Sequence, residues 1–163
     1  MQNLPTIVDS ALESTIRYVT FNVGEEVFWV DIMCVESIIP PQDVTTVPRT
    51  PAYFLGIINL RGEVISVVDM RERFGLPRED ATENTRIVVI MSNGILLGLV
   101  VDRINPIEVL SSSHVQAAPP IAGEERKKFI NGSYKLANER ILLILSHEKL
   151  IDDKDFHIEQ EFN

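Results

Sequence analysis

Apolar and polar residues alternate with a period of two along much of this chain, a pattern typical of β-strands that bury one face. Turn pairs such as Arg61-Gly62 and groups of prolines separate the alternating segments and predict turns and loops. The clearest predicted strands are residues 16–23, 27–32, 56–60, 63–68, 86–91 and 141–145. The pattern therefore predicts an all-β protein in which any helices are short.

Residues 51–77 predict a strand, a tight turn, a returning strand and a capped helix, in that order. The returning strand (EVISVV) is rich in β-branched residues, as expected after the turn pair Arg61-Gly62. Asp69 is predicted to cap the next helix, with Glu72 three positions on to complete a capping box. The result is a rigid hairpin with an arginine at its tip, which is typical of a binding surface.

The order of elements recurs along the chain. A glycine-led hairpin that runs into a capped short helix begins at Gly56 and again at Gly132, and residues 78–85 between the two halves are polar throughout. The recurrence suggests duplication into two five-stranded β units, since small sheets protect their edges best by closing. The predicted parts are an N-terminal arm or short helix (1–15), two subdomains (about 16–77 and about 86–151) and an acidic C-terminal tail (152–163).

Two predicted strands, residues 86–91 (RIVVIM) and 141–145 (ILLIL), are apolar at every or nearly every position. Continuous apolarity indicates burial of both faces of a strand. We expect the outer faces of the two units to pack against each other there.

Charge and cysteine content restrict the function classes. The net charge is −9, which argues against nucleic acids and anionic membrane surfaces, because both are bound by basic faces. Cys34 is the only cysteine, so no intrachain disulfide can form, and a reducing cytoplasm is the expected compartment. The first ten residues lack a basic start followed by an apolar run, so we expect no signal peptide. Direct membrane insertion is not expected, because no apolar stretch approaches ~20 residues.

Candidate catalytic residues are scarce. The three histidines show no metal-ligand spacing with each other or with Cys34, which lies on an apolar segment. The glycines form neither a phosphate-binding loop nor a dinucleotide fingerprint. We therefore predict a protein that is not an enzyme, with no catalytic residues, no metal and no cofactor.

The hairpin segment resembles a known family. The run from Pro51 to Arg71 (PAYFLGIINLRGEVISVVDMR) is similar to the signature of CheW, the coupling protein of bacterial chemotaxis. The segments around Val30-Asp31-Ile32, at residues 86–89 and at 98–102 resemble other parts of the same family. The resemblance covers roughly residues 16–151 and implies two small SH3-like five-stranded β-barrels packed together, with short helices.

The resemblance also implies binding residues. The positions that match contacts to the regulatory domain of a CheA-type histidine kinase are Ile32, Val35 and Gly56. The positions that match contacts to the cytoplasmic tip of a chemoreceptor are Arg61, Ser37, Arg86, Ile104 and Ile107, with hairpin support from Asn59, Leu60 and Gly62. Core packing is the alternative interpretation for the apolar members, and an exposed turn residue without a partner is the alternative for the hairpin arginine.

The chain departs from the family pattern at Ser37, where the family has a glutamate thought to pair with the hairpin arginine. Its neighbour Glu36 is expected to point to the opposite face of the strand and cannot replace that glutamate. Because an exposed ion pair contributes only about 0–1 kcal/mol, we expect the difference to alter docking selectivity and to leave the fold unchanged.

These observations predict a cytoplasmic adaptor, recruited to membrane-associated receptor arrays, that couples methyl-accepting chemoreceptors to a CheA-type histidine kinase by non-covalent binding. One alternative is an adaptor of the same fold in a pilus-motility or surface-sensing pathway. Another is a ligand-binding β-barrel protein that has no kinase partner.

Overall fold

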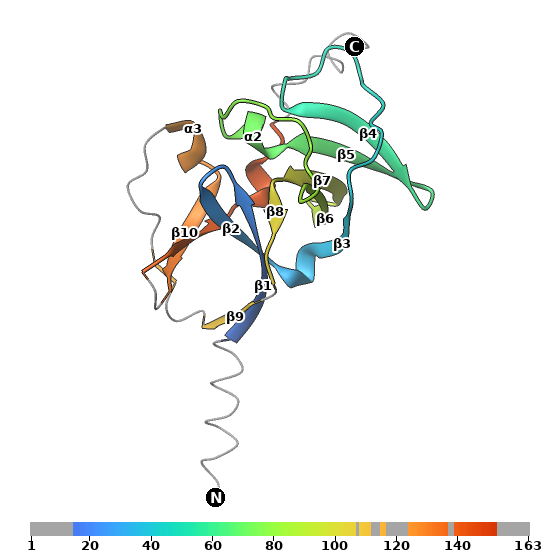
Figure 1. Ribbon diagram of the computed structural model, residues 1–163. Coiled ribbons are helices and arrows are strands. Elements are labelled where there is room, and N and C mark those ends of the chain that lie inside the picture. Colours follow the sequence, from blue (N-terminus) through green and yellow to red (C-terminus); the bar gives the residue numbers. More distant parts are fainter. Residues whose placement is uncertain (1–14, 107, 112–114, 117–123, 137–138, 153–163) are drawn as a thin grey trace, which may run out of the picture.

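The computed structural model describes residues 15–106, 108–111, 115–116, 124–136 and 139–152. Its strands and short helices are shown in Figure 1. They are β1 (Thr15–Val23), β2 (Glu26–Asp31), η1 (Ile32–Cys34), β3 (Val35–Ile39), β4 (Phe54–Leu60), β5 (Glu63–Asp69), α2 (Met70–Arg73), β6 (Arg86–Ser92), β7 (Ile95–Val101), β8 (Arg103–Ile104), β9 (Glu108–Ser111), α3 (Glu124–Lys127), β10 (Ile130–Lys135), β11 (Ile141–Leu145) and η3 (His147–Lys149). The predicted all-β class is confirmed. The predicted N-terminal arm and acidic tail fall almost entirely outside the described residues.

The strands form two sheets. Sheet B has five strands in the order β3-β6-β7-β5-β4. Sheet A has the order β10-β11-β2-β1-β8, and β9 also pairs with β1, which makes six strands where five were predicted. The extra strand arises because β8 pairs with one end of β1 and β9 with the other. Pro106 lies between β8 and β9 and has no backbone N–H for the ladder.

The sheets do not follow the predicted division into residues 16–77 and 86–151. Sheet B combines β3, β4 and β5 with β6 and β7, across the joint at residues 78–85. Sheet A combines β1 and β2 with the strands that follow β7. Two parallel strand pairs, β5 with β7 and β2 with β11, link segments that are distant in sequence. The apparent duplication in the sequence therefore does not correspond to the two sheets.

Short bridges join the edges of each sheet. In sheet B, Thr45 in the loop after β3 pairs with Ile57 of β4 through two hydrogen bonds of 2.9 Å. In sheet A, Gln116 pairs with Ser133 of β10 in the same way. Each sheet thus curves toward closure, as in an SH3-like fold, although the described strand ladders do not form continuous barrels.

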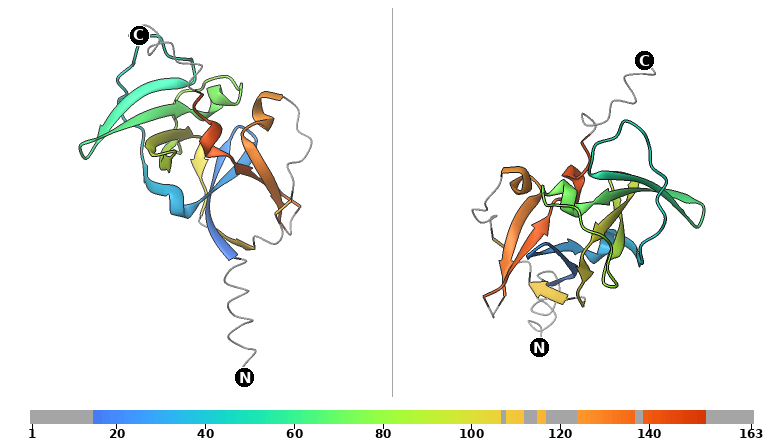
Figure 2. Two further views of the ribbon diagram at one scale, coloured as in Figure 1. Left: turned by 180° about the vertical axis from the view of Figure 1, so that it is seen from behind. Right: turned by 45° about the horizontal axis from the view of Figure 1, so that its top comes forward.

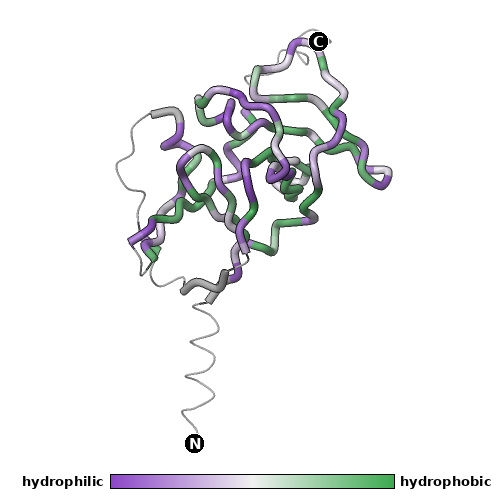
Figure 3. The backbone as a smooth tube through the Cα atoms, in the orientation of Figure 1, coloured by the Kyte–Doolittle hydropathy of each residue, from purple (hydrophilic) through white to green (hydrophobic). Residues whose placement is uncertain are grey.

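The largest apolar cluster lies between the two sheets. It contains Phe21 and Phe28 of sheet A together with Val88 and Ile90 of β6. Alternate residues of β6, including Ile87, belong to a second cluster on the other face of sheet B. The prediction that this continuously apolar strand is buried on both faces is confirmed, and Figure 3 shows the hydrophobic segments gathered along the strands.

The helix caps differ partly from expectation. Asp69 caps α2 as predicted, since its Oδ1 accepts a hydrogen bond of 3.0 Å from Arg71 N. The reciprocal half of the capping box is absent, because Asp69 N donates to Tyr53 O at 2.8 Å and not to Glu72. Ser146 precedes η3 without a side-chain cap bond. No helix in the described part of the chain is long and apolar enough to span a membrane.

Candidate functional site

The β4–β5 hairpin carries the predicted arginine on a tight turn. Arg61 and Gly62 both have positive φ, 53° and 86°, as the two central residues of a type I′ turn require. Asn59 Oδ1 accepts a hydrogen bond of 3.1 Å from Gly62 N, and Leu60 packs partly buried on the apolar cluster of sheet B. The hairpin extends beyond the rest of sheet B in each view of Figures 1 and 2, and its turn is hydrophilic in Figure 3.

The Arg61 side chain is exposed and has no hydrogen bond or salt bridge to any residue that the structure describes. A guanidinium group held on a fixed turn without an internal partner can form bidentate or stacked contacts with another molecule. The local geometry therefore suits binding to another molecule. The residues of the turn alone produce this geometry.

Two of the predicted kinase-contact residues, Ile32 and Val35, lie next to each other on η1 and the start of β3. Both are half-buried and pack against the apolar cluster between the sheets. Met33 between them is 87 % exposed. Burial, and secondarily the negative charge of Asp31, raises the pKa of the Cys34 thiol, whose Sγ donates to Asp31 O at 3.0 Å. Both side chains therefore contribute to the packing between the sheets, and Met33 leaves an apolar side chain exposed beside them.

Gly56, the third of them, is buried and lies on β4, whereas Val35 lies on β3 at the opposite edge of sheet B. The backbone of Gly56 has φ 141° at an irregularity in the pairing of β4 with β5. A Cβ atom added here would lie 2.1 Å from Thr45 O. Gly56 can therefore influence binding only through the backbone that covers it.

A β-bulge at the start of β3 decides the orientation of Glu36 and Ser37. Val35 pairs with Ile90 and Ser37 with Val89, so Glu36 is the extra residue. Glu36 is exposed, and Ser37 is half-buried on the same face of sheet B as Val89. Among the described residues neither one pairs with the hairpin arginine.

The remaining receptor positions are not brought together with Arg61. Arg86 begins β6 opposite Val101, at the far end of the sheet from the hairpin, about 20 Å away at ~3.3 Å per residue. Its Nη1 donates to Glu83 O at 2.9 Å and Thr85 O at 2.7 Å, and so holds the loop before β6. Ile104 pairs with Phe21 and packs on the cluster between the sheets, like Ile32. Ile107 lies outside the described residues.

An ion pair that sequence reasoning missed connects the two sheets. Asp102 accepts hydrogen bonds from Arg71 Nε and Nη2, both 2.9 Å, and from Gly24 N at 2.8 Å. This contact with Asp102 raises the pKa of the Arg71 guanidinium. The three segments are far apart in sequence, so no local sequence pattern predicted the contact.

A second missed contact buries a cation. Arg73 of α2 lies over the rings of Tyr53 and Phe129, 4.0 and 4.5 Å from their centroids. Its Nε donates to Leu150 O at 2.6 Å. The guanidinium thus joins α2, the start of β10 and the C-terminal end of the described chain.

One cluster has residue types used in nucleophilic catalysis. Ser92 Oγ lies 2.8 Å from His147 Nδ1, and His147 Nε2 lies 3.1 Å from Glu148 Oε1. Ser92 is only 3 % exposed, and its Oγ also donates to His147 O at 3.3 Å, so the hydroxyl group is buried within the fold. The cluster ties β6 of sheet B to η3. In the described part of the chain no group of three His, Cys, Asp or Glu side chains could hold a metal ion.

The chain is similar in sequence and in fold to known chemotaxis proteins. A family model described as CheW-like domain matches residues 17–155. The chain is 34 % identical over 126 residues to a chemotaxis protein CheW of Rhizobium meliloti (77 % of this chain, 81 % of that protein). It is 32 % identical over 148 residues to one of Treponema pallidum (88 % and 86 %). It also superimposes on the crystal structure of the scaffolding protein TtCheW from Thermoanaerobacter tengcongensis with a TM-score of 0.78 and 27 % identity, over 86 % of this chain and 97 % of that one.

Proposed function

This chain belongs to the CheW-like domain family and is a chemotaxis adaptor, and we propose that it couples chemoreceptors to a CheA-type histidine kinase through two separate surfaces. One surface contains the hairpin tip with Arg61, and the other contains η1 with Ile32 and Val35. In this role the protein acts by non-covalent binding, in the cytoplasm at membrane-associated receptor arrays.

The observation that carries this proposal is the geometry of Arg61. The turn conformation fixes its backbone, the Asn59 side chain braces the turn, and no described residue neutralises the guanidinium. Arginine at a rigid, protruding position is a frequent centre of binding energy in protein interfaces. We assign this surface to the cytoplasmic tip of a receptor.

The kinase surface is assigned to η1 and the start of β3. Ile32 and Val35 are half-buried, and Met33 exposes most of an apolar side chain beside them. An exposed apolar group next to partly buried ones supports contact with another protein. Gly56 contributes to this surface indirectly. Because it has no side chain, the loop at Thr45 can lie directly on β4.

Two small contacts of this kind bind weakly when taken one at a time. Affinity then comes from many linked contacts within an assembled array. Signalling through such an adaptor is a coupling free energy, in which the state of the receptor shifts the state of the kinase through the shared scaffold.

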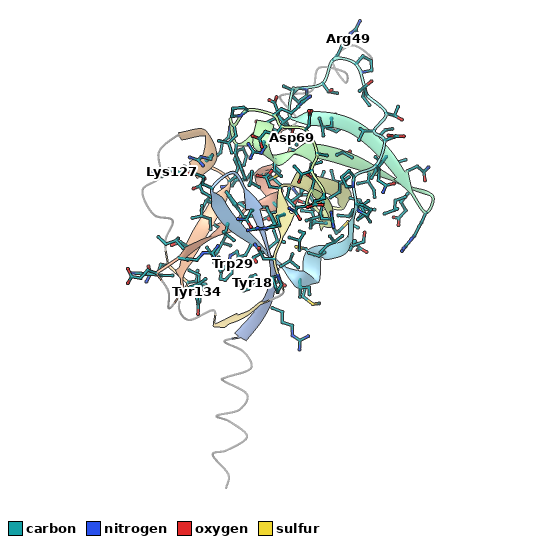
Figure 4. All side chains as sticks on the ribbon, viewed as in Figure 1. Tyr18, Trp29, Arg49, Asp69, Lys127 and Tyr134 are labelled. Carbon is teal, nitrogen blue, oxygen red and sulfur yellow. The ribbon has the colours of Figure 1, made fainter. Side chains whose placement is uncertain are left out.

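The test uses the full-length protein with a receptor-tip fragment and a kinase regulatory domain, each titrated separately by calorimetry. Arg61→Ala is expected to weaken receptor binding at least about tenfold, the size of a moderate interface hot spot, and to leave kinase binding unchanged. Ile32→Asp is expected to do the reverse. Arg49→Ala is the matched control, because Arg49 also has positive φ, 63°, and points away from the body in Figure 4.

Ile32 is partly buried, so thermal unfolding must show that the aspartate variant remains folded, and Ile32→Ala serves as the milder replacement. Loss of both activities in a folded Arg61→Ala variant would contradict the assignment of separate surfaces. Unchanged receptor binding by that variant would remove the hairpin from the receptor contact.

A further inference from the structure

A pocket of about 320 Å³ opens at the end of sheet B opposite the Arg61 turn. Register places it there, because its wall includes Ile87 and Val100, which pair with each other near the Arg86 end of β6. The volume lies within the range of small-ligand sites, about 300–1,000 Å³. The pocket lies away from the Arg61 turn, and Val44 and Leu55 in its wall are the chain neighbours of Thr45 and Gly56.

One side of the pocket is apolar. It consists of Val44 from the loop after β3, Leu55 of β4, Ile87 of β6 and Val100 of β7. All four belong to the apolar cluster of sheet B or pack against it, and only Ile87 is fully buried. The partly exposed wall offers an aliphatic chain a surface from which it would displace water.

The other side of the pocket is charged. Its ionisable side chains are Asp69, Glu79, Asp80, Asp102, Arg71 and Arg78, four carboxylates against two guanidinium groups, an excess of two negative charges. The arginines are already engaged, since Arg71 pairs with Asp102 and Glu79, and Arg78 pairs with Asp69.

Two of the carboxylates are not fully compensated. Asp80 has no hydrogen bond or salt bridge within the described part of the chain. Asp69 is only 7 % exposed, and burial raises the pKa of its carboxyl in spite of the hydrogen bond from Arg71 N and the charge of Arg78. A further positive charge at this side would be attracted, and a carboxylate or phosphate would be repelled.

We propose that this pocket binds an alkylammonium or alkylguanidinium group, with its aliphatic chain on the apolar wall and its charged end toward Asp80. The group can come from a free amine or from a lysine or arginine side chain of another protein. The recognition chemistry is the same in both cases, and the site is independent of the hairpin surface.

The test is an NMR titration of the isotope-labelled full-length protein with pentylammonium, and with pentanoate as an anion of equal chain length. Pentylammonium is expected to shift the amide signals of Leu55, Ile87 and Val100 in a saturable manner that weakens with added salt. Asp80→Asn is expected to weaken binding about fivefold, as for one solvent-exposed charge contact. Glu63→Gln, an exposed carboxylate at the hairpin end, is the control and should bind normally.

A blocked lysine, Nα-acetyl-lysine methylamide, distinguishes the sources. Binding at least as tight as that of pentylammonium would identify a protein side chain as the occupant, and binding of pentylammonium alone would identify a free amine. Equal shifts with pentanoate, or no saturable shift at the pocket with either cation, would overturn the proposal. Neither result would affect the assignment of the Arg61 surface.

Discussion

Replacing Gly56 with alanine should lower the free energy of unfolding more than the same change at Gly62 does. Both glycines have positive φ, 141° and 86°, but their surroundings differ. At Gly62 an added Cβ meets nothing within 4 Å. At Gly56 it would lie 2.1 Å from Thr45 O and 2.8 Å from Val44 Cγ1. The first of these neighbours is backbone and cannot rotate away.

The magnitude follows from what must move. Relief of the contact displaces Thr45 and breaks its two hydrogen bonds to Ile57, each 2.9 Å, which together contribute about 1–3 kcal/mol. Backbone strain of an alanine at this φ adds about 1–3 kcal/mol. The expected loss is about 4 kcal/mol, or roughly 10–15 °C in Tm for a chain of this size. Gly62→Ala should lose only about 1–2 kcal/mol.

Urea denaturation of the two variants and the native protein measures these losses directly. A second readout is the affinity for a kinase regulatory domain at a temperature where all three proteins are folded. We expect that affinity to fall for Gly56→Ala, because the loop at Thr45 is displaced, and to stay the same for Gly62→Ala. Equal losses of unfolding free energy in the two variants would refute the steric argument.

Two further predictions concern buried charges. Asp69→Asn keeps an acceptor for Arg71 N but removes a carboxyl whose pKa is raised by burial. Such a carboxyl stabilises the folded state fully at low pH, and this contribution is lost as the pH rises through the folded pKa, so the stability of the variant relative to native protein should increase as the pH rises above the ordinary titration range of an aspartate. Denaturation at several pH values would show it, and a decrease would contradict it. Arg73→Leu should lower the free energy of unfolding by about 2–4 kcal/mol, because Leu150 O loses its donor. An unchanged urea midpoint would show that this buried cation does not stabilise the fold.

The hairpin shows what local sequence can determine. The Arg61-Gly62 turn, the brace from Asn59 and the cap from Asp69 all involve residues within three positions of each other. Backbone conformation over so short a span depends on steric limits and on nearby donors and acceptors. The exposed arginine on a rigid turn was therefore predictable, and so was the family to which the chain belongs.

The partnership of strands was not predictable from the same information. The apparent repeat suggested two consecutive units, but β5 pairs in parallel with β7, and β2 with β11. Apolar periodicity defines which residues of a strand are buried and does not specify which strand covers them. The predicted burial of both faces of β6 was accordingly right, while the predicted assignment of strands to units was not.

The roles of particular site residues depended on the same long-range arrangement. Gly56 became a buried contact for Thr45, and Arg86 became the residue that holds the loop before β6. Asp102 joined the two sheets through Arg71. The sequence by itself determined the strands, the turn and the exposed arginine, because these follow from short-range geometry. Only the tertiary structure decided which distant backbones and charges meet, because burial and pairing act between segments that the chain order does not place together.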